Sequence, residues 1–374
     1  MEKIKLMTVV GTRPEIIRLS STIKLLDKQE AVEHILVHTG QNYDYELNQI
    51  FFEDLELRSP DYFLEAAKKT AVKTIGTSMI HIEDVINKEK PEAFLVLGDT
   101  NSALTAIVAK KHKIPIFHME AGNRCFDESV PEETNRKIVD HIADINLPYS
   151  SIAREYLLAE GIPADRVIKT GSPMYEVIQD NFSKIKKSSI IRELKLKENN
   201  FFLVSSHREE NVDNEKKLSE FIESLNAIVS KYKIPIIFST HPRTLNRIKD
   251  LAVPMHENIQ IHKPFSFTDY CSLQMNAKAV LSDSGTISEE TSILGLKSLN
   301  IRKSHERPEA MEEGSVMLVG YSKNRILQGL SILDTSPRKR EVRDYIFPNF
   351  SYTVLNAIIS YTDYVHQNRQ DIQI

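Results

Sequence analysis

The sequence predicts an α/β protein made of two Rossmann-like, doubly wound domains that face a cleft. Short apolar runs alternate with amphipathic stretches of helical spacing, which is typical of βαβ units around a parallel sheet. The alternation is interrupted by a polar stretch at residues 180–200 and then starts again. Since a chain of 374 residues has room for two or three domains, two consecutive sheets are the simplest interpretation.

The strand candidates fall into two series. The first series consists of residues 4–10, 35–38, 93–97, 116–118 and 145–147, and the second of residues 201–205, 234–239, 259–262, 279–282, 298–301 and 315–319. Between them, Thr170-Gly171-Ser172-Pro173 indicates a hinge. We therefore predict an N-terminal domain over residues 1–171 and a C-terminal domain over residues 172–351. The last stretch, residues 352–374, has helical apolar spacing and is predicted to pack back on the first domain.

Composition excludes several classes of partner. The 48 basic and 52 acidic residues give a net charge of -4, which leaves no basic footprint for nucleic acid. No apolar run approaches the roughly 20 residues that cross a bilayer, so no membrane partner is expected. The two cysteines are far apart and lack CxxC spacing, which fits a reducing, cytoplasmic compartment.

Neither a metal nor a redox cofactor is predicted. His34 and His38 are spaced as on one helix face, but they lie in a strand-like run, where four residues span roughly 13 Å, too far for one ion. The chain contains neither G-x-G-x-x-G nor G-x-x-x-x-G-K-[ST], which argues against a nicotinamide site and a P-loop. Cys125 is interpreted as a packing residue rather than a nucleophile.

Three acidic residues stand where predicted strands end: Asp99, Glu120 and Glu132. Ligands of open parallel sheets bind beyond the carboxyl ends of the strands, so these carboxylates indicate proton-transfer chemistry. The alternative is that they are helix N-caps and surface acids. Two arginines of the same loops, Arg124 and Arg136, favour a site.

Two further segments are suited to an anion. Gly11-Thr12-Arg13-Pro14 follows the first strand and presets a helix start on which an anion could rest, with Arg13 beside it. Ser284-Gly285-Thr286 opens a helix after an apolar run, where hydroxyls and backbone N–H groups suit a pyrophosphate and Glu290 a ribose diol. The alternative for the second segment is an N-capped helix with a capping-box glutamate.

Two more strand-end segments complete the candidates. His207 and Arg208 follow the first strand of the second domain, and His241 has a similar place with weaker support. Arg307 offers a guanidinium for phosphate.

Taken together, the chain resembles the non-hydrolysing UDP-N-acetylhexosamine 2-epimerases nearly end to end. The matching motifs are GTRPE, GDT, EAG, PEE-x-NR, SDSG and ERPE. The resemblance implies the glycosyltransferase-B arrangement of two domains, no cofactor, a UDP-2-acetamido sugar as substrate, and a homodimer.

The resemblance also implies site residues. An acid-base set is carried over to Asp99, Glu120, Glu132 and His207, without an assignment of acid and base. The implied UDP and substrate contacts are Arg13, Arg18, Arg136, Tyr270, Ser284, Gly285, Thr286, Glu290 and Arg307. Arg18 stands where the family has a lysine, which keeps the charge but not the geometry.

Departures from the family pattern bear on the sugar. EAGNRC in place of EAGLRT, and SGT in place of SGG, resemble the branch that converts UDP-2-acetamido-2,6-dideoxy-L-talose to UDP-N-acetyl-L-fucosamine for surface polysaccharides. Gln41-Asn42 stands where many bacterial members have Gln-His in an allosteric contact loop, a departure that weighs against such regulation and leaves the existence of an allosteric site open.

The reaction implied is elimination of UDP and its readdition through a 2-acetamidoglycal. Three alternatives stay open: a UDP-N-acetylglucosamine 2-epimerase giving UDP-N-acetylmannosamine, a UDP-sugar glycosyltransferase of the same architecture, and a non-catalytic UDP-sugar binder. Entry of solvent deuterium at C2 would separate both epimerases from the last two.

Overall fold

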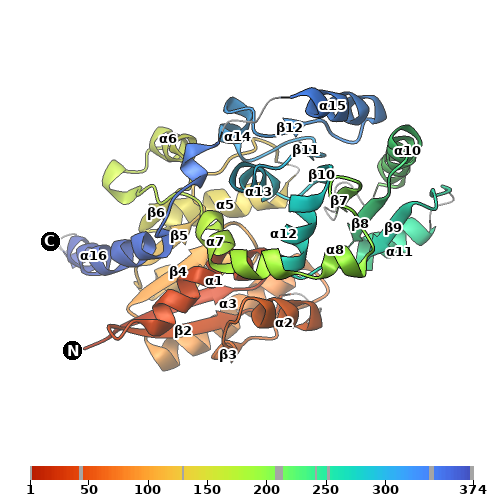
Figure 1. The fold of residues 1–374 in the computed structure, drawn as a ribbon. Coiled ribbons are helices and arrows are strands. Elements are labelled where there is room, and N and C mark those ends of the chain that lie inside the picture. Colours follow the sequence, from red (N-terminus) through yellow and green to blue (C-terminus); the bar gives the residue numbers. More distant parts are fainter. Residues whose placement is uncertain are drawn as a thin grey trace. The chain divides into compact units, whose positions relative to one another are not determined.

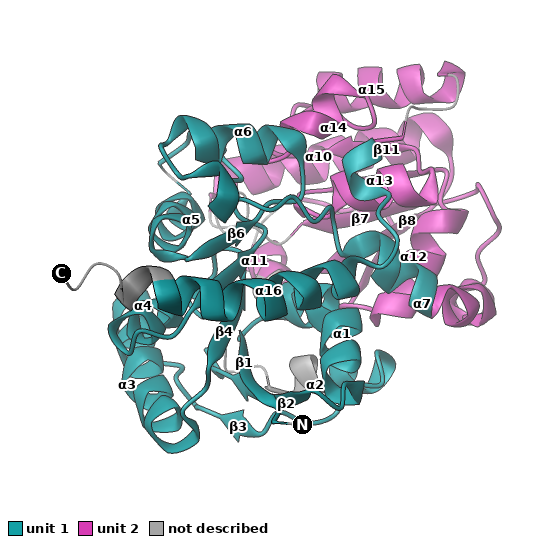
Figure 2. Ribbon diagram, turned by 90° about the vertical axis from the view of Figure 1, so that its left-hand side faces the viewer, with its two compact units in different colours: residues 1–180, 343–374 teal, residues 181–342 magenta. Residues whose placement is uncertain are grey.

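The computed structural model describes residues 2–41, 45–128, 130–206, 214–240, 242–250, 253–336 and 341–370. Within these ranges the chain forms two compact units, residues 1–180 with 343–374 and residues 181–342 (Figure 2). Each unit is built around one parallel six-stranded sheet (Figure 1). The predicted doubly wound fold class is thereby confirmed.

Unit 1 has the strand order β3-β2-β1-β4-β5-β6. Its strands are β1 (Ile4–Val10), β2 (Val32–His38), β3 (Tyr62–Phe63), β4 (Ala93–Leu97), β5 (Ile116–Met119) and β6 (Ile145–Leu147). Its helices are α1 (Arg13–Lys28), α2 (Tyr45–Asp54), α3 (Ala71–Glu89), α4 (Ala106–Lys111), α5 (Pro131–Ile142), α6 (Ser151–Ala159) and α16 (Phe350–Gln370). Short 3₁₀ turns occur at Ala103–Thr105, Ala164–Arg166 and Arg343–Tyr345.

Unit 2 has the strand order β12-β11-β10-β7-β8-β9. Read from β9, this is the same order of strands as in unit 1. Its strands are β7 (Phe202–Ser206), β8 (Ile236–Thr240), β9 (Ile259–His262), β10 (Ala279–Ser282), β11 (Ser298–Asn300) and β12 (Met317–Leu318). Its helices are α8 (Ile190–Glu193), α10 (Glu215–Tyr232), α11 (Pro242–Asp250), α12 (Phe267–Asn276), α13 (Ile287–Leu294), α14 (Pro308–Glu312) and α15 (Lys323–Thr335).

Several strands carry unbroken apolar runs because helices cover both faces of each sheet. In β7, Phe202 and Val204 pack against α10 and α15. Leu203, and Phe201 just before the strand, pack with residues of α8, α12 and α13. Since side chains alternate between the two faces of a strand, a strand buried on both faces reads as an unbroken apolar run.

The chain passes between the units within α7 (Met174–Lys187) and returns after Val342. The domain limits predicted at residues 171 and 351 lie close to these crossings and stay a prediction. Helix α16 belongs to unit 1, where the Ser351 hydroxyl lies 3.1 Å from that of Thr22 on α1.

Strand prediction succeeded for the long apolar runs and missed β3, which has only two residues. Each predicted run overlaps a strand of the structure. Among the residues described, none of the helices combines the length and apolarity needed to span a bilayer.

His34 and His38 both lie on β2, as predicted. The His34 ring contacts side chains other than His38: its Nδ1 lies 2.6 Å from Asp27 and its Nε2 2.9 Å from the Thr8 hydroxyl. His38 is buried, stacks on Phe63 with ring centroids 4.9 Å apart, and accepts a hydrogen bond from the Gly40 N–H at Nδ1. Because an accepting Nδ1 carries no proton, the fold holds His38 neutral.

We expect His38 to weaken the protein in acid. Burial lowers its pKa from 6.5 to about 4, so the unfolded chain takes up this proton at a higher pH than the folded protein. Above pH 6.5 His38 is neutral in both states and costs no stability. Between pH 6.5 and 4 the free energy of unfolding falls, by roughly 3 kcal/mol in total. Urea unfolding at pH 7 and pH 4.5 measures the loss.

The matched variants are His38→Asn, whose side-chain oxygen can still accept from Gly40, and His112→Asn at a half-exposed site. His38→Asn should flatten the acid limb and His112→Asn should leave it unchanged. An equally steep limb in His38→Asn would rule out His38 as its source.

Candidate functional site

Several predicted site residues of each unit follow strands at or next to the point where the strand order reverses. In unit 1 this point lies between β1 and β4, and in unit 2 between β7 and β10. Arg13 follows β1, Asp99 follows β4 and Glu120 follows β5. In unit 2 the Ser284 loop follows β10 and Arg307 lies beyond β11. Doubly wound sheets bind ligands at this place.

Asp99 is oriented by Arg136, a residue of α5. Arg136 Nε lies 3.1 Å from Asp99 Oδ2, and the same oxygen accepts from Nη2. Arg136 Nη1 donates to Glu133 at 2.7 Å, and Asn135 donates its side-chain amide to the Asp99 carbonyl at 2.9 Å. The predicted substrate contact Arg136 is thus placed between two carboxylates, where it fixes the Asp99 side chain.

Glu120 is held in the neighbouring loop by one arginine and one asparagine. Its carboxylate forms an ion pair with Arg18 of α1, and Asn123 donates its side-chain amide to Oε1 at 3.3 Å. Glu120 Oε2 lies 3.9 Å from the position that a Cβ on Gly98 would take. The structure therefore brings the Asp99 and Glu120 loops together, and both carboxylates are largely shielded, with side chains 18% and 12% exposed.

The other two predicted residues of unit 1 lie at helix starts. Contrary to the prediction, Glu132 does not follow a strand directly but is half-buried in the first turn of α5, next to the buried Glu133. Arg13 is half-buried at the start of α1, with its guanidinium carbon 5.4 Å from the centroid of the Phe51 ring.

A buried carboxylate, Glu15, joins the loop after β1 to the loop after β4. It accepts from the Gly11 N–H at 3.0 Å, the Thr12 hydroxyl at 2.8 Å and the Thr100 hydroxyl at 3.1 Å, and also from Ser102. Burial raises the pKa of Glu15 although these donors lower it. Glu15 therefore fixes the loop on which Asp99 lies.

In unit 2 the Ser284 loop forms a polar turn at the start of α13. The Ser284 N–H donates to the Ser282 hydroxyl at 3.1 Å, and the Ser284 and Thr286 hydroxyls lie 2.9 Å apart. Thr286 is the N-cap residue but makes no side-chain cap hydrogen bond. The capping-box alternative is therefore wrong.

Arg307 joins the loop beyond β11 to this turn. Its Nη2 lies 3.1 Å from Glu289 and its Nε donates to the Gly285 carbonyl at 3.2 Å, and the Arg307 side chain is 3% exposed. A guanidinium beside the start of a helix is suited to a diphosphate.

Tyr270 on α12 and Glu290 on α13 lie near each other in unit 2. Tyr270 donates its hydroxyl to Ser205 at 2.9 Å, and Gln274 donates its amide to Glu290 at 2.5 Å. Burial, and next the charge of Glu290, raise the pKa of Tyr270, so the phenol stays protonated as a hydrogen-bond donor.

Some predicted residues lie outside the part of the chain that the structure describes. They are Asn42 in the loop compared with an allosteric contact, His207 with Arg208 after β7, and His241. Their proposed roles rest on sequence alone.

Comparison with known proteins decides the family. Residues 24–358 match the family model described as UDP-N-acetylglucosamine 2-epimerase. The chain belongs to the UDP-N-acetylglucosamine 2-epimerase family. It is an enzyme family of isomerases, and the fold class with two Rossmann-like domains of glycosyltransferase-B type agrees with it.

Three relatives illustrate the range of the family. A solved structure of UDP-N-acetylglucosamine 2-epimerase from Rickettsia bellii is 48% identical, with TM-score 0.91 over 98% of this chain and 99% of that chain. The Methanocaldococcus jannaschii UDP-N-acetylglucosamine 2-epimerase is 37% identical over 88% of this chain and 92% of its own length. A structure of the UDP-GlcNAc 2-epimerase from that organism, in complex with UDP-GlcNAc and UDP, has TM-score 0.88 at 34% identity over 96% and 100% of the two chains.

A further relative differs in its sugar. The UDP-2,3-diacetamido-2,3-dideoxy-D-glucuronate 2-epimerase of Pseudomonas aeruginosa is 33% identical over 87% of this chain and 90% of its own length. As their names state, these epimerases share the reacting carbon and differ in the rest of the ring.

Sequence reasoning missed two buried glutamates that support the site of this epimerase family member, Glu15 and Glu133. Glu15 could have been found, because it stands in the GTRPE motif itself. Glu133 stands beside the predicted Glu132, and its carboxylate accepts from Arg136 at 2.7 Å and from the Cys125 N–H at 3.1 Å. The interpretation of Cys125 as a packing residue fits its Sγ, 3.3 Å from the same carboxylate.

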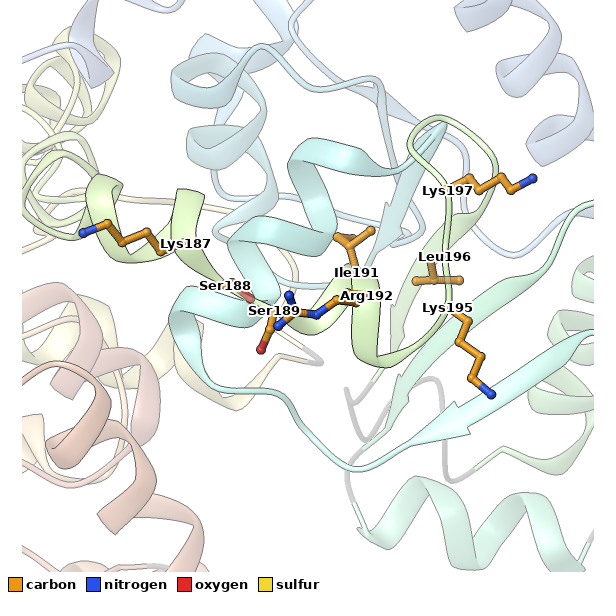
Figure 3. A pocket seen from close by; sticks show the side chains of 8 residues that line it. All are labelled: Lys187, Ser188, Ser189, Ile191, Arg192, Lys195, Leu196 and Lys197. Carbon is orange, nitrogen blue, oxygen red and sulfur yellow. The ribbon is translucent and has the colours of Figure 1, made fainter.

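A basic hollow on unit 2 is not part of this site. It has a volume of about 550 Å³ and is lined by α8 and the segment before β7 (Figure 3). Lys187, Lys195 and Lys197 point in different directions there (Figure 3). Because the ammonium groups do not converge, the hollow does not form a phosphate cradle.

Proposed function

We propose that this protein inverts C2 of a UDP-2-acetamido sugar by eliminating UDP and adding it back. The observation that carries the proposal is the pair of shielded carboxylates, Asp99 and Glu120, on adjoining loops at one sheet edge, each held by an arginine. Two carboxylates positioned around one ring can exchange protons on different faces of it. A relative in complex with UDP-GlcNAc and UDP supports UDP as the departing group.

The chemistry follows from the substrate. The C2–H bond is not next to a carbonyl, so its direct deprotonation would leave an unstabilised carbanion. When a base takes the C2 proton, the C–H electrons instead form the C1=C2 double bond and the C1–O bond breaks toward UDP. The resulting 2-acetamidoglycal is then protonated at C2 on the opposite face, and the UDP oxygen re-forms the bond to C1.

The chain's own residues supply each part of this scheme. Asp99, Glu120 and Glu132 with His207 are the proposed acid-base set, with acid and base unassigned. Arg13, Arg307 and the Ser284-Gly285-Thr286 turn would neutralise the departing diphosphate, which is the largest new charge in the reaction. Tyr270 and Glu290 would bind the nucleoside. No redox step occurs, so no cofactor is required.

For the sugar we propose UDP-2-acetamido-2,6-dideoxy-L-talose, converted to UDP-N-acetyl-L-fucosamine. Asn123, in EAGNRC, contacts the proposed catalytic carboxylate directly, which supports a pocket adapted to a different ring. The second candidate is UDP-N-acetylglucosamine, which the names of two relatives favour. A homodimer is proposed from the resemblance.

The test is turnover in D₂O, followed by NMR, with each of the two sugars in turn. We expect an epimer carrying deuterium at C2, and ¹⁸O placed in the bridging position should scramble into non-bridging positions. Turnover of UDP-N-acetylglucosamine alone would overturn the proposed sugar. Absence of deuterium at C2 with both substrates would favour a transferase or a binding protein.

A further inference from the structure

A fully buried histidine, His118, connects the two loops that carry the proposed catalytic carboxylates. It lies on β5 with no exposed surface. Its Nε2 is 2.8 Å from the carbonyl oxygen of Gly98, and its Nδ1 is 2.9 Å from Asp140 Oδ1 on α5. Gly98 directly precedes Asp99 in sequence.

Both ring nitrogens of His118 face hydrogen-bond acceptors. The Gly98 carbonyl can only accept, so Nε2 must carry a proton. Burial by itself would raise the pKa of Asp140, but its contacts with His118 and Arg124 lower the pKa overall, which keeps the carboxylate ionised. The ionised Asp140 carboxylate thus lies beside Nδ1 of His118, and Nε2 donates to the Gly98 carbonyl.

Asp140 anchors the loop on the other side of this pair. It accepts from the Gly122 N–H at 3.2 Å and from Arg124 Nη1 at 2.7 Å. Gly122 and Arg124 belong to the loop that begins at Glu120. His118 thus holds the Asp99 loop by the Gly98 carbonyl, while the neighbouring Asp140 holds the Glu120 loop by the Gly122 N–H group.

We propose that His118 is a positioning residue for the epimerisation, which sets the Asp99 carboxylate by fixing the Gly98 carbonyl. The inference rests on the proposed function, since it assigns His118 no contact with substrate. A side chain that must lie within about 0.5 Å of its productive place depends on such buried support. The Gly98 carbonyl belongs to the peptide group that joins Gly98 to Asp99, so the imidazole contacts the peptide directly before Asp99.

The test uses two amides that each replace one half of the ring. The amide nitrogen of His118→Gln can take the place of Nε2 and donate to Gly98, whereas that of His118→Asn can take the place of Nδ1 and donate to Asp140. We expect His118→Asn to lower kcat and C2 deuterium exchange by about 30-fold with KM within about 3-fold. His118→Gln should keep kcat within about 3-fold of the unchanged protein.

The outcomes separate the inference from the function on which it rests. Equal losses of kcat in both variants, or full activity in folded His118→Asn, would overturn the positioning role. If His118→Asn does not fold, a folded His118→Gln that loses more than about ten-fold in kcat overturns it and one that retains activity supports it. Absence of deuterium exchange in the unchanged protein would instead refute the proposed function.

Discussion

Replacement of Asp99 by asparagine is expected to lower kcat, and the exchange of the C2 hydrogen with solvent, by about 1000-fold. The amide has the shape of the carboxylate but cannot take up or release the proton. Its oxygen can still accept from Arg136, and the Asn135 bond to the backbone carbonyl is untouched. The diphosphate contacts proposed for unit 2 are also untouched, so the dissociation constant of UDP should change by no more than about 3-fold.

The experiment combines NMR detection of C2 deuterium with calorimetric titration of UDP. Asp84→Asn, which removes an exposed carboxylate from α3, is the matched control and should exchange at the original rate. Exchange at the original rate in Asp99→Asn would remove Asp99 from the mechanism. Loss of UDP binding would show that the substitution disturbs more than proton transfer.

The sequence predicted the sheets well because both are buried on both faces. Runs such as residues 93–97 consist only of apolar residues, all of them buried, and a buried parallel strand has no other stable pattern. Once the strands are known, the ends of β4 and β5 place Asp99 and Glu120 at one edge. The two-residue β3 lacks such a run and was missed.

The partners of the carboxylates could not be predicted in the same way. Arg136 meets Asp99 because α5 packs at the end of β4, and this depends on the rotation of a helix rather than on any local pattern. The same rotation brings Asp140, four residues later on α5, to His118 and the Gly122 N–H. Residues spaced by four lie on one face of a helix, but the sequence does not say which face meets the strand ends.

Replacement of Gly122 by alanine should destabilise unit 1 by about 3–5 kcal/mol. Gly122 has φ +80°, and a Cβ there would lie 2.3 Å from the carbonyl oxygen of Ala153 on α6. Because that oxygen is backbone, the loop or the helix must move. The move would also disturb the Gly122 bond to Asp140. A fall in the melting temperature of roughly 10 °C, with loss of activity, is expected.

Gly161→Ala separates the close contact from the backbone conformation. Gly161 has a similar φ of +88°, but a Cβ there would meet nothing within 4 Å. This variant bears only the cost of a left-handed alanine, about 1–2 kcal/mol, and should keep its activity. Differential scanning calorimetry of both variants decides the matter. Equal losses would mean that the backbone conformation alone requires glycine after Glu120-Ala121, and a larger loss in Gly122→Ala would mean that α6 holds this loop in place.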